Sequence, residues 1–376
     1  MFHIALLFCF IYVFWRFVIP LPWRFAYKLV LAGVLLLVSK YHLIQLLVFG
    51  TMFSPEMPRV LVILCGWLFC AFVLLLLIHI TFDLLLAATW VVRRGRPLGA
   101  RFQVYSRYGM ACLALALSAI GVNQAVQVPE VRRMELGIRN LPPAFDGFRI
   151  VQLSDPQLSR LLEAPWAEDL VARTNSLQAD LIVITGDLID GTPQARHNDV
   201  QPLSKLSARH GVIASLGNHE YFFDARVWTA EFQRLGMRVL VNQHELVDEQ
   251  GQSLIVAGIA DPVATAFNHE APDLTKALAG APAGLPIVLL SHQPIDVLQH
   301  AAAGVDLQLS GHTHGGMVRG LDWFIGRFNG GYVSGLYVIE TMLLYVNNGA
   351  GLWNGFPIRL GVPSEITEIV LRPAAA

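Results

Sequence analysis

Long apolar runs dominate the first third of the chain, and short ones dominate the rest. Four runs, at about 2–20, 26–49, 60–82 and 108–128, contain few charged positions. An apolar helix of roughly 20 residues crosses the ~30 Å hydrocarbon core of a bilayer. Helices buried in a soluble protein normally keep a polar face, which these runs lack. The pattern therefore predicts a transmembrane region at 1–128 with four spans and the bilayer as its partner.

Basic residues between the runs predict how the spans are oriented. The first and third connections carry most of the positive charge, on Arg16, Arg24, Lys28, Arg93, Arg94, Arg96, Arg101 and Arg107. The second connection carries only Arg59. Positively charged loops stay in the cytoplasm, so the N-terminus and the body after residue 128 are expected outside it. Three arginines just beyond the last run weigh against this orientation: Arg132, Arg133 and Arg139.

Charge composition divides the chain at the same place. Only 15% of the 376 residues are charged, whereas a soluble globular protein has roughly 25%. Residues 1–128 contain ten Lys or Arg and two Asp or Glu, a balance of +8. Residues 129–376 contain 17 Lys or Arg and 26 Asp or Glu, a balance of −9, and the two balances add to the net charge of −1. An acidic second body excludes nucleic acid as the expected partner, because duplex binding needs a basic face.

Two ionisable side chains lie at the end of the third apolar run. His79 and Asp83 are four residues apart and share one helix face. Ionisable groups inside a membrane are functional candidates by default, and transport through the spans would rest on these two residues alone. The alternative interpretation is that Asp83 lies near the headgroups and pairs with His79 or a nearby arginine.

From Phe148 onward, short apolar runs alternate with stretches rich in Gly, Pro and Asp. Such runs predict buried strands, here at 148–153, 181–185, 212–216, 254–259, 286–290, 305–309, 332–339, 342–347 and 365–371. Intervening stretches predict helices at 165–178, 200–209, 225–236 and 294–303. The alternation predicts an α/β layered domain at 147–371, preceded by a linker at 129–146 and followed by a tail at 372–376.

Polar residues follow five of these strands directly. They are Asp155, Gln157, Asp187, Asp190, Asn218, His219, His292, His312 and His314. Ligands of open α/β sheets gather beyond the carboxyl ends of strands, and five such ends in order indicate a metal site. A mixed Asp, His and Asn set suits Mn, Fe or Zn better than calcium. Two ions about 3.5–4 Å apart, bridged by a carboxylate, clamp both the attacking and leaving oxygens of a phosphoryl group.

The order of three motifs resembles the calcineurin-like metallophosphoesterase superfamily over about 147–371. The motifs are GDLID at 186–190, GNHE at 217–220 and GHTHGG at 311–316, and the segment 353–366 resembles the bacterial membrane-associated or exported branch. The resemblance implies two sheets flanked by helices in a four-layer sandwich, with two divalent metal ions (Mn, Fe or Zn, with Mg possible). It also implies hydrolysis of a phosphate ester or pyrophosphate of a phosphorylated small molecule or lipid, on a bacterial inner-membrane protein.

Carried over by position, the resemblance implies a role for each polar residue. The metal ligands would be Asp155, Gln157, Asp187, Asn218, His292, His312 and His314. Of these, Asp187 would bridge the two ions, and His314 would return to the first. His219 would act as the catalytic group that donates to the phosphate oxygens or the leaving group. Asp190 would orient His219.

One position departs from the pattern of the superfamily. Its first motif is normally Asp-x-His, whereas this chain has Asp155-Pro156-Gln157. A glutamine carbonyl is a weaker ligand than imidazole for these metals. Gln157 could coordinate through oxygen, the first site could bind loosely or take a water, or catalysis could be lost. Retention of the other ligands favours an enzyme. The alternative is a non-catalytic phosphate-binding membrane sensor or scaffold.

The stretch 158–166 offers one further candidate surface. It contains Leu158, Leu161, Leu162 and Trp166, directly after the first motif. These side chains predict either an apolar lip toward acyl chains or a helix packed on the sheet.

Overall fold

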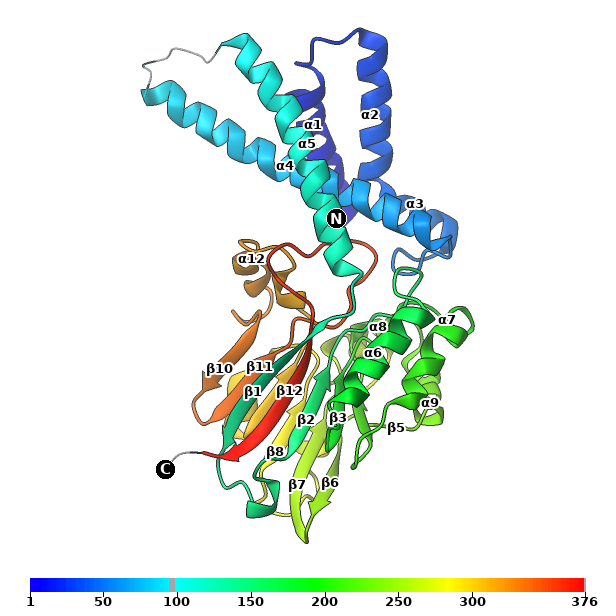
Figure 1. Ribbon diagram of the computed structural model, residues 1–376, viewed down its shortest axis with the longest axis vertical. Coiled ribbons are helices and arrows are strands. Elements are labelled where there is room, and N and C mark those ends of the chain that lie inside the picture. Colours follow the sequence, from blue (N-terminus) through cyan, green and yellow to red (C-terminus); the bar gives the residue numbers. More distant parts are fainter. Residues whose placement is uncertain (93, 95–98, 375–376) are drawn as a thin grey trace. The chain divides into compact units, whose positions relative to one another are not determined.

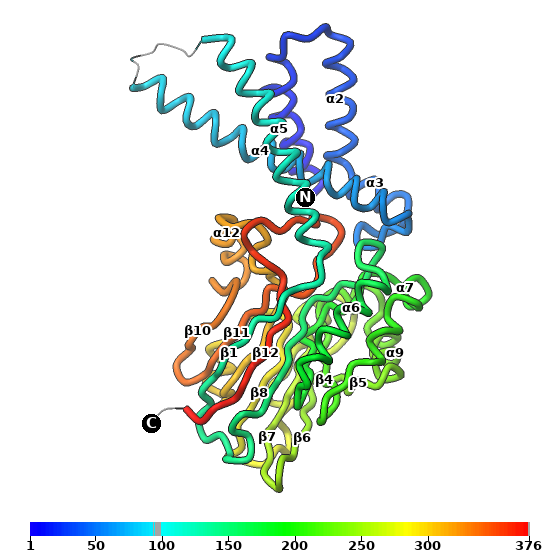
Figure 2. Tube along the Cα trace, viewed as in Figure 1, coloured from blue at the N-terminus to red at the C-terminus, as the bar shows by residue number. Residues whose placement is uncertain are grey.

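The computed structural model describes residues 1–92, 94 and 99–374 (Figures 1 and 2). Arg93 and Arg96, used above for orientation, and the last two residues of the predicted tail lie outside the described residues. The chain forms two compact units. One is Met1–Gln124 with Asn354–Ile358, and the other is Ala125–Trp353 with Arg359–Ala376. We call them the helical unit and the α/β unit.

The helical unit contains two helices that are long and apolar enough to cross a membrane. Its elements are α1 (Phe2–Val13), η1 (Phe14–Val18), α2 (Phe25–Ser39), α3 (Tyr41–Phe49), α4 (Arg59–Val92) and α5 (Ala100–Ala125). By length and composition α4 and α5 qualify alone, whereas α2 and α3 qualify only together, as a pair bent by 59°. The first helix is shorter because Pro20 and Pro22, which lack a backbone N–H, follow it. The described helices thus offer two or three spans, and the expected four are not confirmed.

Asp83 is paired within the helical unit. The Arg16 guanidinium donates Nε and Nη2 to the two Asp83 oxygens at 2.7 and 2.6 Å, and the Tyr12 hydroxyl donates to Asp83 at 2.6 Å. His79 Nδ1 instead lies 3.0 Å from the Leu75 carbonyl oxygen on its own helix. A bidentate guanidinium–carboxylate pair is a strong link between helices. Asp83 therefore pairs with a nearby arginine, which is the alternative interpretation given above.

Five residues from late in the chain belong to the helical unit. His42 Nε2 lies 2.9 Å from the Gly355 carbonyl oxygen, and the rings of Phe69 and Phe356 meet edge to face with centroids 6.2 Å apart. A Cβ at Gly66 would lie 2.6 Å from Pro357 Cγ. Glycine at position 66 therefore permits this close approach.

The α/β unit is built on two six-stranded sheets (Figure 1). The first has the order β1-β12-β2-β3-β4-β5 and the second the order β10-β11-β9-β8-β7-β6. Their bounds are β1 (Glu130–Ile138), β2 (Arg149–Leu153), β3 (Leu181–Thr185), β4 (Val212–Ser215), β5 (Met237–Val239), β6 (Gln243–Glu249), β7 (Gln252–Gly258), β8 (Ile287–Leu290), β9 (Leu307–Ser310), β10 (Gly335–Ile339), β11 (Met342–Val346) and β12 (Glu365–Pro373). Strands β2 to β5 run parallel, and so do β7, β8 and β9.

The core lies between the two sheets, and helices flank them. Ile150 and Val183 of the first sheet share one buried apolar cluster with Val288 and Leu309 of the second. The helices are α6 (Ala164–Ser176), α7 (Pro193–Val200), α8 (Asn218–Phe222), α9 (Ala225–Arg234), α10 (Leu274–Ala277), α11 (Val297–Ala302) and α12 (Asp322–Gly326), and the short helical turns are η2 (Pro143–Phe145), η3 (Gln201–Lys205), η4 (Pro262–Phe267) and η5 (His314–Gly316). The expected α/β domain with two sheets flanked by helices is confirmed.

Several segments differ from the sequence-based expectation, and β5, β6, α8, α10 and α12 were not predicted at all. Residues 129–146, expected as a linker, include β1, which pairs in parallel with β12 from Glu130 opposite Glu365 onward. Burial of Leu136 and Ile138, two residues apart on one face, fixes this strand in the core. Residues 200–209, expected as a helix, contain only the short turn η3 after α7, which the sequence did not predict.

The apolar stretch 158–166 packs inward. Leu158, Leu161 and Leu162 are fully buried, and Trp166 on α6 is 7% exposed. Packing, rather than a lip toward acyl chains, is thus the role of these side chains.

Candidate metal centre

The carboxyl ends of five strands bring the predicted ligands together. Asp155 follows β2, Asp187 follows β3, Asn218 opens α8 after β4, His292 follows β8 and His312 follows β9. Each strand is held in the core by its apolar side chains, so only the residues just past its end can face a shared space. All five side chains are buried or half-buried.

The first group of side chains forms a compact set of metal-ligand atoms. One ligand atom each from Asp187, His292 and His312 lies within 4.8 Å of the others. The Asn218 Oδ1 atom lies 3.1 Å from His292 Nε2 and 3.0 Å from His312 Nδ1. Burial, and then the charge of His292, lower the pKa of His312 to about 3. A neutral imidazole at His312 is the form that can bind a metal.

Asp155 and His314 form a second group beside it. His314 Nε2 lies 3.7 Å from Asp155 Oδ1, while Asp155 Oδ2 accepts hydrogen bonds from Ser154 Oγ at 2.6 Å and His312 N at 3.1 Å. Within the described part of the chain, Asp155 Oδ1, His314 Nδ1 and Gln157 Oε1 are buried without a hydrogen-bond partner. An unsatisfied buried polar atom costs roughly 1–3 kcal/mol. These residues therefore fit a bound cation, which would satisfy the atoms that protein groups leave unpaired.

Gln157 lies beside two other predicted site residues. Its Nε2 is 3.4 Å from Asp187 Oδ2 and 3.5 Å from His219 Nε2. The amide thus directs a donor at the predicted bridging carboxylate. Rotation about its last torsion would present the unpaired Oε1 at the same place instead.

His219 and Asp190 form a buried hydrogen-bonded pair. His219 Nδ1 bonds Asp190 Oδ1, and His219 Nε2 lies 3.8 Å from Asp187 Oδ2. Burial opposes the charged imidazole, but the carboxylates of Asp190 and Asp187 outweigh it and raise the pKa of His219 to about 9. A protonated His219, oriented through Nδ1, can give the Nε2 proton to an oxygen atom in the site.

Two residues without a predicted role position these groups. Glu220 accepts backbone N–H bonds from Gly217 at 2.7 Å, Asp187 at 3.0 Å and Leu188 at 2.6 Å, and so fixes the Asp187 loop. Arg359 is fully buried and donates to four backbone carbonyls, those of His314, Asn348, Gly349 and Gly351. The only sequence signal for Glu220 is its place in the GNHE motif.

Backbone geometry marks the same positions. Five predicted ligands have φ between 45° and 68°, namely Asp155, Gln157, Asp187, His312 and His314. Left-handed φ is uncommon outside glycine and is held only where surrounding structure enforces it, most often at functional sites. The backbone strain therefore supports the ligand assignment independently of side-chain distances.

Gly217 should be required for the position of Asp187. A Cβ at residue 217 would lie 2.2 Å from Asp187 Oδ1. We expect Gly217→Ala to weaken metal binding roughly tenfold by displacing the carboxylate, and overpacking of this kind costs about 1–3 kcal/mol. Manganese titration by calorimetry checks the first effect and thermal unfolding the second. Gly109→Ala is the control, because its Cβ would meet nothing within 4 Å; unchanged binding by Gly217→Ala would refute the expectation.

The fold and site together define a metal-dependent hydrolase whose centre lies at the strand ends of two packed sheets. The calcineurin-like phosphoesterase family matches residues 148–316. A Campylobacter jejuni protein described as an uncharacterized metallophosphoesterase is 31% identical over 285 residues, which cover 74% of this chain and 73% of that protein. The chain belongs to the calcineurin-like phosphoesterase family and is a metal-dependent phosphoesterase, as the sequence predicted.

Two further proteins are similar to this chain, one in sequence and one in structure. A Bos taurus protein described as a transmembrane protein with metallophosphoesterase domain is 33% identical over 75% of this chain and 67% of its own length. Among solved structures, a Thermus thermophilus 5′-nucleotidase precursor matches with a TM-score of 0.40 and 16% identity over 59% of this chain. The chain spans about half of that nucleotidase, and a likeness so weak carries no argument about function.

Proposed function

We propose that the chain is a membrane-anchored phosphoesterase with two metal ions. Its substrate is a phosphate ester or pyrophosphate of a lipid-linked or cell-envelope compound. The carrying observation is the pair of adjoining ligand groups, which Asp187 of the first group connects through a 3.4 Å contact with Gln157 of the second. Asn218, His292 and His312 would hold one ion with Asp187, while the other would be held by Asp187, Asp155 and His314, with Gln157 as a weak ligand.

The described residues give each step of hydrolysis a group that can perform it. When bound, two divalent ions neutralise phosphoryl oxygens and make water more acidic. The water oxygen forms a bond to phosphorus as the bond to the leaving oxygen breaks, and the proton that the water loses passes to solvent, from which His219 is later reprotonated. His219 Nε2 donates its proton to that leaving oxygen, while Asp190 holds Nδ1 and the ring orientation. Mixed oxygen and nitrogen ligands favour Mn, Fe or Zn, with Mg also accommodated.

The proposed location follows from the helical unit. Apolar helices α4 and α5 support membrane anchoring, and the basic connections support a catalytic domain outside the cytoplasm of a bacterial cell, with four spans. A catalytic unit tethered this way works where phosphorylated lipids are concentrated. The acidic balance of residues 129–376 supports such substrates over nucleic acid.

A second candidate, a non-catalytic phosphate-binding sensor, has one observation in its favour. The Gln157 amide donates toward Asp187, where the superfamily motif supplies an imidazole ligand. If the first ion is missing as a result, the chain would bind phosphate through the second ion and His219 without turnover.

Manganese titration and phosphodiester hydrolysis distinguish the two candidates. We expect the wild-type chain to bind two Mn²⁺ ions unequally and to hydrolyse an aryl phosphodiester. Gln157→His should tighten the weaker site roughly ten- to hundredfold. Equal, tight binding of both ions by wild type would contradict the weak-site assignment. Turnover seen only with Gln157→His would establish the sensor.

A further inference from the structure

A cluster of exposed aromatic side chains follows the GHTHGG loop. Trp323, Phe324 and Phe328 are 62, 50 and 72% exposed, on α12 and the turn after it. Among the described residues of the α/β unit, the other strongly exposed aromatic side chain is Phe267, at 40%. Ring centroids of Trp323 and Phe324 are 6.1 Å apart, and those of Phe324 and Phe328 are 5.2 Å apart. The three rings form one patch, and a contiguous exposed apolar patch marks an interaction surface.

Two exposed arginines accompany the rings. The Arg327 guanidinium lies 5.3 Å from the Trp323 ring centroid, and Arg319 donates two N–H groups to the Gly361 carbonyl oxygen. Asp322 is the acidic residue between them, and its Oδ1 accepts the backbone N–H of Gly320. Residues 319–328 therefore carry a net charge of +1. We call this segment the aromatic platform.

The aromatic platform is packed on the loop that carries two metal ligands. A Cβ at Gly316, the last residue of η5, would lie 2.9 Å from Asp322 Cα, so α12 contacts the GHTHGG loop at backbone distance. The far end is fixed too, because buried Asn329 donates Nδ2 to the Ile325 carbonyl oxygen at 3.0 Å. The segment with the exposed rings is therefore held at both ends, and the contact at Gly316 lies two residues after His314. The rings belong to an ordered segment rather than to a loose loop tip.

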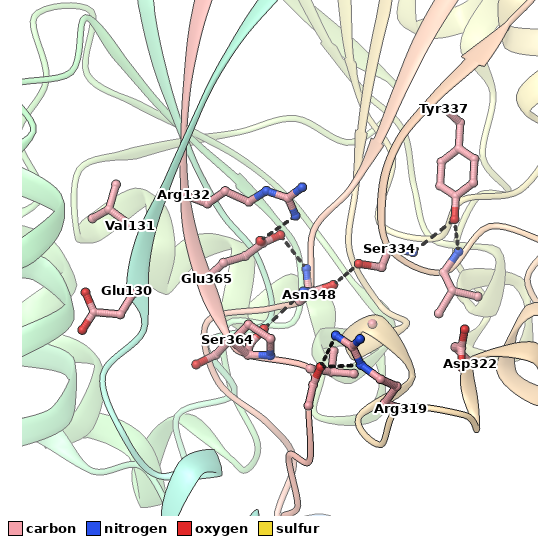
Figure 3. Close-up of a pocket in the computed structure, with 15 residues that line it drawn as sticks. Glu130, Val131, Arg132, Arg319, Asp322, Ser334, Tyr337, Asn348, Ser364 and Glu365 are labelled. Atoms are coloured by element: carbon pink, nitrogen blue, oxygen red, sulfur yellow. Dashed lines mark hydrogen bonds and ion pairs between the residues drawn. The ribbon is translucent and has the colours of Figure 1, made fainter.

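A cavity of about 690 Å³ adjoins the platform (Figure 3). Arg319 and Asp322 line it from the platform side, and Gly315, next to His314, lines its wall. Two pairs of other lining residues contact each other, Ser334 with Asn348 and Arg132 with Glu365. A cavity of this size can hold a small ligand, and the platform forms part of its wall.

We propose that the aromatic platform docks into the headgroup–acyl boundary of a bilayer that contains anionic phospholipid. Tryptophan prefers this boundary because its ring is apolar and its N–H is polar. Arginines beside it are attracted to anionic headgroups. The membrane anchoring proposed for the helical unit would keep the partner within reach wherever the protein is. Docking would bring headgroups to the cavity and the His312–His314 turn, a consequence that rests on the proposed function.

Brominated lipids test the docking without any measurement of activity. The full chain is reconstituted in vesicles of phosphatidylcholine and phosphatidylglycerol whose acyl chains are brominated near the headgroup. The difference in fluorescence between wild type and Trp323→Phe gives the contribution of Trp323. We expect this contribution to be quenched in the brominated vesicles relative to unbrominated ones. The quenching should be weaker when phosphatidylglycerol is omitted. Trp228→Phe is the matched control, because Trp228 is fully buried in the same unit and its fluorescence should resist quenching.

A second variant connects the platform to lipid turnover. Phe324→Ala with Phe328→Ala should raise the KM for a vesicle-borne phosphodiester roughly tenfold through lost local concentration. Its hydrolysis of a soluble aryl phosphodiester should be unchanged. The docking would be overturned if Trp323 fluorescence were not quenched in the brominated vesicles. It would also be overturned if the environment of Trp323 changed only at a high protein-to-lipid ratio, which would indicate contact between copies of the chain. Quenching without hydrolysis of either substrate would overturn the proposed function and leave the docking intact.

Discussion

Asp187→Ala is expected to lower metal-dependent phosphodiester hydrolysis by about 10³-fold or more. Asp187 Oδ2 lies 3.2 Å from His292 Nε2 and 3.4 Å from Gln157 Nε2, so this carboxylate belongs to both ligand groups. Its Oδ1 accepts the His219 backbone N–H at 2.8 Å. Alanine therefore removes the carboxylate proposed as the shared ligand and loosens the turn that presents His219.

The loss also changes the charge of the site. Burial lowers the pKa of His292, but Asp187 outweighs burial and holds it well above its usual value. Without Asp187, neither an imidazolium nor a metal ion at His292 has its carboxylate partner. Buried charges without a partner are strongly unfavourable. We therefore expect calorimetry to show weaker binding of both Mn²⁺ ions rather than of one.

Asp169→Ala on α6 is the matched control, because Asp169 is exposed. It should keep the wild-type rate and both ions. Thermal unfolding of each variant shows whether the fold survives. Hydrolysis by a folded Asp187→Ala protein within tenfold of wild type would refute the bridging role.

The strands that carry the site could be predicted because their signal is local. The runs before Asp187 and His292 are apolar at nearly every position, as expected for strands covered on both faces, whereas the run before Asp155 also contains Arg149 and Gln152. Polar residues that follow such runs meet at one sheet edge, so the ligand set could be predicted as a set. Its distances could not, because they depend on how the two sheets pack.

Other features depend on partners that are distant in the sequence. Four of the nine residues of β1 are charged, so its sequence is typical of a linker. Its pairing with β12, which is distant in the sequence, is what makes it a strand. Glu220 has no local signature of a positioning role, because the backbone groups it accepts come from the β3 end and the β4 end together. The aromatic platform was likewise missed, because apolar residues in a short loop predict packing as readily as exposure.

The left-handed φ angles explain why the motifs contain so many glycines. Gly186, Gly315 and Gly316 have φ of 87°, 62° and 78° beside ligands that are themselves left-handed. Side chains must turn back toward one space within two or three residues of a strand end, and extended backbone cannot do this. Glycine adopts these φ values without a steric cost, so the motif glycines let the neighbouring ligands face one space.

The second large effect is expected at His219. His219→Gln should slow hydrolysis of a phosphodiester with an alkyl leaving group by about 10²–10³-fold. An alkoxide needs a proton as it leaves, and the pKa of His219, raised to about 9 mainly by Asp190 against the effect of burial, keeps that proton available at neutral pH. A p-nitrophenolate leaves without one, so its rate should fall far less. The ratio of the two rates, measured with saturating Mn²⁺, isolates proton donation from metal binding.

Asp190→Asn tests the positioning of this proton donor. The amide preserves the shape of Asp190 but removes the charge that favours protonated His219, so the alkyl ester rate should fall less than in His219→Gln and should fall increasingly as pH rises. His197→Gln is the control, since His197 is an exposed histidine on α7. Equal losses for alkyl and p-nitrophenyl esters in His219→Gln would assign the residue to phosphate binding instead of proton donation. That outcome would leave the leaving oxygen to be protonated by water and would remove Asp190 from the mechanism.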